Sequence, residues 1–313
     1  MAFSPAGQPY VVFEDFANFR KATVMKFNGS NWVNVGIAGF STGVVNYTNL
    51  AFSASGQAYV AYSDSGNYNK ATVMKFDGSN WVNVGNAGFT AGEADFISLA
   101  FSPSDGQPYI AYSDGAYSKK ASTMKYNGSS WVYVGRAGFS AGIVYYTSLS
   151  FSQSGQANVA FRDGGNADKA TVMKFNGSAW NYVGNAGFSD GVAGFTSLTF
   201  NTSGQLFVAY EDFANGNKAT VMKFDSVFVG INETKGSGLS VYPDPAMDKI
   251  TIETSEVTNT SQLAILNIDG QQVISCQITG HKTQLDIRNL PNGVYFARLT
   301  DEKSVEVKKI IKQ

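Results

Sequence analysis

The sequence predicts an all-β protein: a five-bladed (or truncated larger) β-propeller of four-stranded blades, followed by a C-terminal immunoglobulin-like β-sandwich. Three observations carry this prediction: a unit of about 49 residues that occurs five times, four strand-like runs in each unit, and a change of composition after residue 231. Of the 313 residues, 43% are hydrophobic and only 15% are charged. This composition is typical of a folded chain rather than a disordered one.

The repeat keeps almost the same length in every copy. Gly-Gln pairs recur at intervals of 49, 50, 49 and 49 residues, beginning at Gly7, Gly56, Gly106, Gly155 and Gly204. All four tryptophans of the chain share one phase of the unit: Trp32, Trp81, Trp131 and Trp180. A period near 50 residues is typical of a propeller blade.

Each copy contains four runs rich in Val, Tyr, Phe and Thr that are bounded by turn residues, and nothing in the copies predicts a helix. In the second copy these runs cover residues 47–53, 58–64, 70–76 and 81–85. An Asn-Gly or Asp-Gly pair precedes the fourth run and predicts a tight hairpin turn. The connections between second and third runs, here called the second-to-third loops, are long and vary between copies. Since they share one face of the disc, we expect binding on that face.

The two ends of the repeat region are irregular. The chain begins inside the first strand of the first copy, and the fifth copy carries no tryptophan. No basic and apolar secretory signal is visible at residues 1–10. These features predict that the N-terminus is incomplete. We expect the propeller at residues 1–231, a polar linker at 232–238 and the sandwich at 239–313.

One aspartate recurs at the end of the second run in every copy. A ring of carboxylates could bind a cation such as calcium. A local pair with a lysine six residues later, or capping of the following turn by the side chain, explains the repetition without a ligand. We therefore predict no metal and no cofactor. The residues are Asp15, Asp64, Asp114, Asp163 and Asp212.

The recurring apolar residues are interpreted as packing. In "KATVMKF" (70–76), Thr, Met and Phe are predicted on one face of the strand, and Val and Lys on the other. Met and Trp of successive copies are expected to fill the interfaces between blades. The long loop after each fourth strand carries a Phe that we predict to be a buried anchor: Phe40, Phe89, Phe139 and Phe188.

The second-to-third loops supply the candidate ligand-binding residues, because they differ between copies and combine aromatic rings with amides. Such side chains suit a carbohydrate ligand, and they are equally common at protein interfaces. The candidates are Phe16, Phe19, Tyr68, Tyr117, Phe213, Asn67 and Asn215.

Catalysis is not expected. The only histidine and the only cysteine, His281 and Cys276, lie in the tail, which excludes Ser-His-Asp, Cys-His and His-based zinc sites from the repeats. Glu14-Asp15 and Glu211-Asp212 offer carboxylate pairs, but neighbours in a strand point to opposite faces. A net charge of −1, without long runs of one sign, predicts no nucleic-acid partner, and no stretch of about 18 apolar residues predicts membrane insertion.

The tail carries four ordered motifs: "VYPDPAMDKITI" (241–252), "AILNIDGQQV" (264–273), "LDIRNLPNGVYFARL" (285–299) and the terminal "VKKIIKQ". Together they resemble the type A C-terminal sorting domain of type IX secretion cargo proteins in Bacteroidetes-like bacteria. That family usually has Pro-Asn-Pro where this chain has Pro243-Asp244-Pro245.

The resemblance implies export by a signal peptide, then passage through the outer-membrane translocon with residues 239–313 as the partner of the secretion machinery. It also implies an extracellular or outer cell-surface location. The residues that carry the motif are Tyr242, Pro243, Asp244, Pro245, Asp248, Gly270, Leu290, Gly293, Tyr295, Lys308 and Lys309.

These observations predict a secreted or cell-surface, non-catalytic binding protein whose propeller loops bind a carbohydrate or a protein. Two alternatives stay open. One is a purely structural or adhesive surface module, and the other is a polysaccharide-acting hydrolase or lyase with a carboxylate pair in the propeller.

Overall fold

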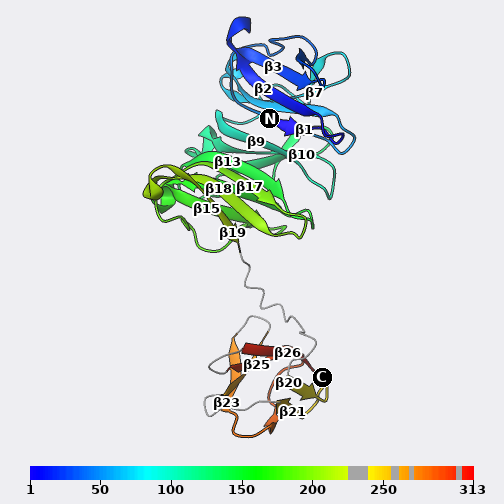
Figure 1. The fold of residues 1–313 in the computed structure, drawn as a ribbon, viewed down its shortest axis with the longest axis vertical. Coiled ribbons are helices and arrows are strands. Elements are labelled where there is room, and N and C mark those ends of the chain that lie inside the picture. The colour runs from blue at the N-terminus through cyan, green and yellow to red at the C-terminus, as the bar shows by residue number, and fades with distance from the viewer. Residues whose placement is uncertain (225–238, 255–260, 268–270, 301–304) are drawn as a thin grey trace. The chain divides into compact units, whose positions relative to one another are not determined.

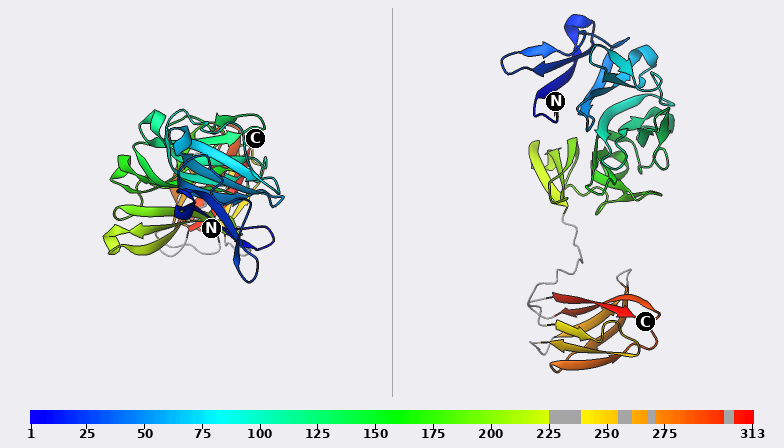
Figure 2. Two further views of the ribbon diagram at one scale, coloured as in Figure 1. Left: turned by 90° about the horizontal axis from the view of Figure 1, so that it is seen from above. Right: turned by 90° about the vertical axis from the view of Figure 1, so that its right-hand side faces the viewer.

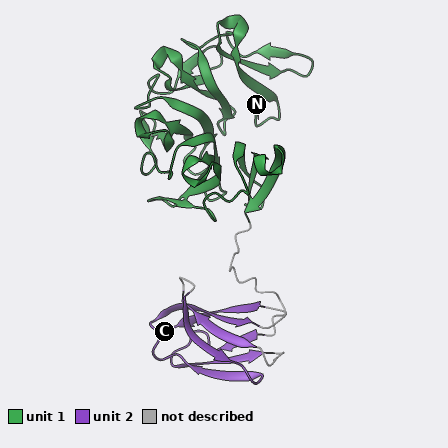
Figure 3. Ribbon diagram, turned by 90° about the vertical axis from the view of Figure 1, so that its left-hand side faces the viewer, with its two compact units in different colours: residues 1–225 green, residues 226–313 purple. Residues whose placement is uncertain are grey.

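The computed structural model describes residues 1–224, 239–254, 261–267, 271–300 and 305–313. The chain divides into two compact units, residues 1–225 and 226–313 (Figure 3). Each unit is described separately. Within unit 1 the first to fourth strands of a blade form one antiparallel sheet in sequence order.

Unit 1 holds the five predicted blades (Figure 1). Blades 1 and 2 consist of β1 (Ala2–Phe3), β2 (Pro9–Asp15), β3 (Lys21–Phe27) and β4 (Trp32–Asn34), then β5 (Val45–Phe52), β6 (Ala58–Asp64), β7 (Lys70–Phe76) and β8 (Trp81–Asn83). Blades 3 and 4 consist of β9 (Ala94–Phe101), β10 (Pro108–Asp114), β11 (Lys120–Tyr126) and β12 (Trp131–Tyr133), then β13 (Val144–Phe151), β14 (Ala157–Asp163), β15 (Lys169–Phe175) and β16 (Trp180–Tyr182).

Blade 5 has three described strands: β17 (Ala193–Phe200), β18 (Leu206–Asp212) and β19 (Lys218–Phe224). The altered fourth strand that the sequence predicts falls at residues 225–231, outside the described residues. The first strands of successive blades contact one another, so they form the inner edge of the unit. Figure 2 shows the blades following one another along an arc, with blade 1 and blade 5 at its two ends.

Short 3-10 turns interrupt the second-to-third loops, where the sequence predicted no helix. They cover Phe16–Asn18, Ser65–Asn67, Gly115–Tyr117, Gly164–Asn166 and Phe213–Asn215. In blades 1 to 4 the recurring aspartate before the turn accepts a hydrogen bond from a backbone N–H inside it. Local capping of this kind can stabilise one turn without any helical pattern in the sequence.

The blades pack through opposite faces of the same strand, as predicted. In β15, Val172 packs against blade 5, whereas Met173 packs against residues of blade 3 such as Tyr109. The tryptophans of blades 2 to 4 are each 8% exposed and cross the junction to the preceding blade. Gly85 lies beside Trp131 with a φ of +76°, and a Cβ there would meet the indole Cδ1 at 3.2 Å. The Gly that ends "WVNVG" therefore makes room for the next tryptophan.

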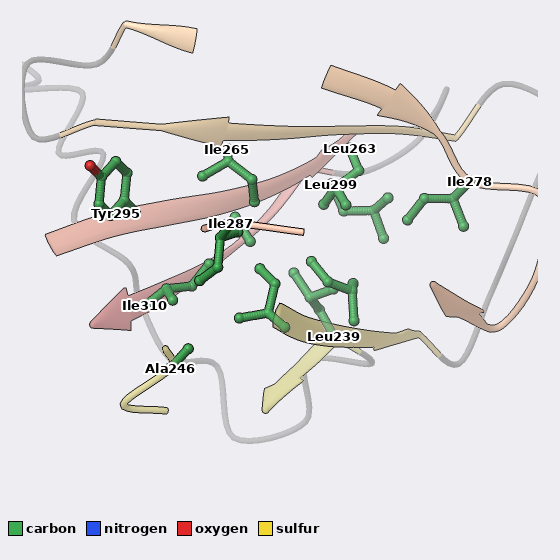
Figure 4. Packing of buried hydrophobic residues seen from close by; sticks show 12 residues of the cluster. Leu239, Ala246, Leu263, Ile265, Ile278, Ile287, Tyr295, Leu299 and Ile310 are labelled. Carbon is green, nitrogen blue, oxygen red and sulfur yellow. The ribbon is translucent and has the colours of Figure 1, made fainter. Parts of the chain in front are cut away.

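Unit 2 is a two-sheet sandwich of seven described strands, as the sequence predicted. One sheet has the order β20 (Leu239–Tyr242), β21 (Lys249–Thr254), β24 (Lys282–Asp286). The other has the order β23 (Gln272–Gln277), β22 (Gln262–Leu266), β25 (Gly293–Thr300), β26 (Val305–Lys312). Side chains of both sheets meet in one core, in which Leu239 lies opposite Leu263 and Leu299 (Figure 4).

Candidate binding face

The predicted ligand-binding residues of the second-to-third loops lie at the surface. That they bind a ligand stays a prediction. Tyr68 is 85% exposed, and Phe16 and Phe19 are similarly open. Tyr117 and Phe213 are about half as exposed, and the Tyr117 ring lies edge-on to Tyr133 at 6.1 Å. The loops therefore present aromatic rings singly rather than as one cluster: two in blade 1, one each in blades 2, 3 and 5, and none in blade 4.

The two predicted asparagines differ in their surroundings. The Asn67 amide donates to Oδ2 of Asp64 at 2.8 Å, so this side chain holds its own turn together. The corresponding amides of blades 1 and 4, Asn18 and Asn166, make the same bond to Asp15 and Asp163. Asn215 in blade 5 is exposed.

The recurring aspartates of blades 1 to 4 cap turns, whereas Asp212 of blade 5 makes no such hydrogen bond. Asp64 is fully buried and accepts hydrogen bonds from the Gly66 N–H at 3.0 Å, the Asn67 amide at 2.8 Å and the Thr72 hydroxyl at 2.9 Å. Three donors satisfy a buried carboxylate without a metal or a lysine. Across the described ranges, no group of three or more His, Cys, Asp or Glu residues is arranged to hold a metal ion.

A second set of aromatic residues lines the inner edge of the unit, and the sequence reasoning missed it. The first strand of each of blades 2 to 5 carries an aromatic residue at the same position: Tyr47, Phe96, Tyr146 and Phe195. Consecutive ring centroids are 4.7, 5.0 and 4.6 Å apart, so the four rings form a continuous series that we call the aromatic ladder. Phe195, at its end, is 67% exposed.

The ladder lies on the same face of the blades as the second-to-third loops, which we call the loop face. Each of its residues occupies an irregularity in the pairing of the first and second strands, between Asn46 and Asn49 in blade 2. Just beyond it, Val45 pairs with Asp64, the residue that leads into the second-to-third loop. Since the first strands also form the inner edge, the ladder lies at the inner rim of the loop face.

The backbone of the ladder is unusual for aromatic residues. Its φ angles are +52°, +51°, +53° and +47° at Tyr47, Phe96, Tyr146 and Phe195. Bulky residues rarely adopt this left-handed conformation, because Cβ then crowds the following carbonyl oxygen. The same costly conformation occurs in four blades. It breaks the regular alternation of side chains between the two faces of the strand and so changes the direction in which each ring points. Strain that persists in this way is a feature of binding and catalytic sites.

Charged side chains flank the middle of the ladder. The Lys119 ammonium lies 2.6 Å from an oxygen of Asp95 and 2.8 Å from one of Glu93. Partial burial lowers the pKa of Lys119, but the hydrogen bonds to both carboxylates outweigh this effect and raise it. Asp95 directly precedes Phe96 of the ladder, so this ion cluster lies beside it. Burial and then the charge of Asp95 raise the pKa of Tyr47, against the opposing charge of Lys119.

A second ion pair lies one blade further along. The Arg162 guanidinium donates to Asp168 at 2.9 Å and lies 5.0 Å above the ring of Tyr145. The Tyr145 ring in turn contacts Phe96 of the ladder at 5.6 Å. Arg162 occupies the position of Ser63 and Ser113 in blades 2 and 3, so the rim differs in charge from blade to blade.

The carboxylate pairs considered for catalysis have separate partners. Glu14 forms an ion pair with Arg20, whereas Asp15 accepts from the Thr23 hydroxyl and the Ala17 N–H. In blade 5, Asp212 accepts from the Thr220 hydroxyl, while Glu211 lies beside the backbone of Gly194. Each glutamate thus lies in different surroundings from the adjacent aspartate.

The motif residues of the tail build the sandwich at several points. Oδ1 of Asp244 accepts from the Ile311 N–H at 2.7 Å and joins the "PDP" turn to the last strand. The backbone carbonyl of Asp248 accepts from the Ile287 N–H, and the Tyr295 hydroxyl donates to the Pro291 carbonyl, both at 2.8 Å.

The other motif residues are distributed as follows. Leu290 packs against the core, and the Tyr242 hydroxyl donates to Glu253 at 3.0 Å. Pro243 and Pro245 flank Asp244, and Gly293 begins β25. On β26, Lys308 is half-buried and Lys309 is exposed. Gly270 lies outside the described residues.

The fold and these motifs define a class: a blade-repeat propeller that carries a secretion domain at its C-terminus. Residues 240–313 match the family model of the secretion system C-terminal sorting domain, and this part of the chain belongs to that family. The domain implies secretion to the cell surface or beyond it. No curated protein matches the chain. None of the helices in the described ranges has the length and apolar character needed to cross a membrane.

Solved structures whose backbone is similar to that of this protein share little sequence with it. PorZ, a surface component of the type IX secretion system of Porphyromonas gingivalis, is 11% identical, with a TM-score of 0.38 over 93% of this chain and 48% of PorZ. The chain thus spans about half the length of PorZ. An exo-β-1,3-galactanase from Clostridium thermocellum is 12% identical (TM-score 0.41; 95% and 76% covered). An endo-1,4-β-xylanase from Bacteroides thetaiotaomicron is 10% identical (TM-score 0.44; 88% and 91% covered).

Proposed function

We propose that this protein is a secreted or cell-surface binding protein, without catalytic activity, whose loop face binds a carbohydrate. The observation that carries the proposal is the aromatic ladder at the inner rim of that face. Its four rings lie within 5.0 Å of their neighbours and are held by a backbone conformation that aromatic residues rarely adopt.

The chemistry of the ladder suits a sugar chain. Apolar faces of successive sugar rings can stack on aromatic side chains, and carboxylates and amides beside the rings can bind hydroxyl groups. Glu93, Asp95 and Asp168 supply such carboxylates, and Lys119 and Arg162 supply donors. The three acids and two bases leave no excess of positive charge, which favours a neutral glycan over an acidic one.

A protein ligand is the second candidate, because exposed aromatic rings such as Tyr68 and Phe19 on the second-to-third loops are typical of protein interfaces. The two candidates differ in where binding energy resides. A glycan that stacks on the ladder depends on Tyr47 and Phe195, whereas a protein that contacts the loop tips depends on Phe19 and Tyr68.

A glycan array probed with the full chain tests the proposal. Binding to neutral oligosaccharides is expected, with at least a tenfold loss of affinity in Tyr47→Ala and Phe195→Ala. Tyr182→Ala is the matched control, because this exposed ring lies on the outermost strand of blade 4. Equal losses in the control, or no glycan binding by the unaltered chain, would refute the carbohydrate proposal.

The non-catalytic part of the proposal has its own measurement. The chain is incubated with the polysaccharides that it binds, and new reducing ends and unsaturated sugars are quantified over time. We expect no products. Turnover by the unaltered chain that Glu93→Gln or Glu14→Gln abolishes would replace this part of the proposal with the hydrolase or lyase alternative.

A further inference from the structure

A pocket recurs between neighbouring blades on the face opposite the loop face. This opposite face, which we call the hairpin face, carries the turns that join first and second strands, such as residues 53–57 between β5 and β6. Between blades 2 and 3 the pocket has a volume of about 340 Å³. Equivalent pockets between blades 1 and 2 and between blades 3 and 4 have volumes of about 300 and 470 Å³. Ligand pockets begin at about 300 Å³, so each has room for a sugar-sized ring.

The repeat gives the three pockets the same kind of wall. The pocket between blades 2 and 3, which we call the middle pocket, is lined by Tyr59 and Lys75 of blade 2 and by Phe101 and Gln107 of blade 3. The rings of Tyr59 and Phe101 meet edge to face, with 4.8 Å between centroids. The Tyr59 hydroxyl donates to Oε1 of Gln57 at 3.2 Å, which fixes the direction of the ring. The same edge-to-face pair lines the other two pockets, as Tyr10–Phe52 and Tyr109–Phe151.

The three pockets differ in charge, although each contains a lysine at the same position of the third strand. Between blades 3 and 4, Lys125 forms an ion pair with Asp105 at 3.3 Å. Between blades 1 and 2, the pocket that Lys26 lines also contains the carboxylate of Asp77. In the middle pocket, Lys75 is the only charged residue among the described lining residues, and no described acid lies within ion-pair distance of it. The middle pocket is therefore positive, whereas an acid offsets the lysine in each of the other two.

Two side-chain amides add hydrogen-bonding groups to the middle pocket. Gln107 is half-buried and Asn83 is exposed, and within the described part of the chain neither side chain has a hydrogen-bond partner. A sugar ring with a carboxylate matches this set of groups. Its apolar C–H face can lie against an aromatic ring, its hydroxyls can bind the amides, and its carboxylate can accept a charge-assisted hydrogen bond from the Lys75 ammonium.

We propose that the middle pocket binds a uronic acid, and that Lys75 makes it selective for the acidic sugar over the neutral one. The pocket is a site separate from the aromatic ladder. Lys75 pairs with Tyr59 near the hairpin end of β6, whereas Asp64, at the other end of the same strand, leads into the loop face. The uronic acid site is thus independent of the neutral glycan proposed for the loop face.

An NMR titration of the isotope-labelled full chain with D-galacturonate tests the proposal, with D-galactose and acetate as comparison ligands. The backbone amides of Gly106 and Gly155 are the reporters, because these glycines line the middle pocket and the pocket between blades 3 and 4. At Gly106, galacturonate is expected to bind at least fivefold more tightly than galactose or acetate. It is also expected to bind at least fivefold more tightly at Gly106 than at Gly155.

Three variants test the role of the lysine. Lys75→Met should weaken galacturonate binding at Gly106 at least fivefold, to the level of galactose. Lys125→Met is the matched control and should leave the Gly106 response unchanged, because this lysine lines a different pocket. Asp105→Asn removes the ion pair of Lys125 and should strengthen galacturonate binding at Gly155 at least fivefold. Unchanged positions of the remaining amide signals confirm that each variant is folded.

Four results would overturn the proposal. They are a Gly106 signal that does not respond to galacturonate, binding of galactose or acetate there as tight as that of galacturonate, unchanged binding in Lys75→Met, and no gain at Gly155 in Asp105→Asn.

Discussion

The indole Nε1 of Trp131 donates a hydrogen bond to the carbonyl oxygen of Val84 at 2.7 Å and so joins blade 3 to blade 2. Its ring also stacks on Phe89 from the long loop after the fourth strand of blade 2, with 4.4 Å between centroids. The same arrangement recurs at Trp81 and Trp180. A motif that repeats along the chain thus marks the contacts between neighbouring blades.

Trp131→Ala is expected to lower the free energy of unfolding by about 3–5 kcal/mol, because it removes a buried ring and leaves a cavity between two blades. Trp32→Ala is the matched control, since this ring is 42% exposed at the end of the arc and should cost about 1 kcal/mol or less. Urea unfolding followed by circular dichroism gives both values. Similar losses in the two variants would contradict the role of the indole as a clamp between blades.

The repeat allowed most of the propeller to be predicted, because each copy states the same pattern again. The position of "NGSNW" between two strands predicts the hairpin, and Gly29 and Gly78 indeed have φ angles of +101° and +106°. Alternation along "KATVMKF" predicts the two blade interfaces. The 3-10 turns were missed because a single capped turn leaves no periodic pattern in the sequence.

The aromatic ladder could not be predicted from the same alternation. Tyr47, Phe96, Tyr146 and Phe195 recur at intervals of 49, 50 and 49 residues, so the sequence does contain a signal. In a regular strand these residues would simply alternate with their neighbours and pack between blades. The irregular pairing at this position turns them to the rim, and irregular pairing depends on contacts between strands that the local sequence does not reveal.

Two substitutions of Phe195 distinguish the free-energy cost of the ladder's backbone conformation from the contribution of the aromatic ring to glycan binding. Phe195→Ala keeps a Cβ at a φ of +47°, whereas Phe195→Gly relieves that crowding. The Gly variant is therefore expected to be more stable than the Ala variant by about 1 kcal/mol, measured by thermal and urea unfolding. Both should lose glycan binding equally, because both lack the ring. An Ala variant as stable as the Gly variant would show that the backbone carries no strain.

Thr23 is expected to set the acid sensitivity of the first turn. The hydroxyl of Thr23 and then the amide of Asn18 donate to Asp15 and lower the pKa of its carboxyl. A lowered pKa means that the folded state favours the charged form. This contribution is therefore full above about pH 4 and is lost as the pH falls through the folded-state pKa.

Thr23→Val should accordingly raise the pKa of Asp15 toward its ordinary value and move acid unfolding to a higher pH. A carbon-detected NMR titration of the Asp15 carboxyl gives the first quantity, and fluorescence against pH gives the second. Thr199→Val, an exposed threonine on β17, serves as the control and should change neither. An unchanged Asp15 titration in Thr23→Val would contradict the assignment of this hydrogen bond.

Substitutions of two adjacent residues of β26 distinguish the stability of the sorting domain from its recognition by the secretion machinery. Ile310 is 1% exposed in the core shared by both sheets, so Ile310→Ala should lower the stability of the domain by about 2–5 kcal/mol. Lys309 is exposed and belongs to the sorting motif, so Lys309→Glu should leave the melting temperature unchanged and reduce export severalfold.

The secreted fraction of the full chain, expressed in a bacterium with a type IX system, gives the export value. Gln277→Glu, an exposed change on β23 outside the motif, is the control for charge alone. If Lys309→Glu is exported as well as the unaltered chain, this lysine is not part of the surface that the secretion machinery recognises.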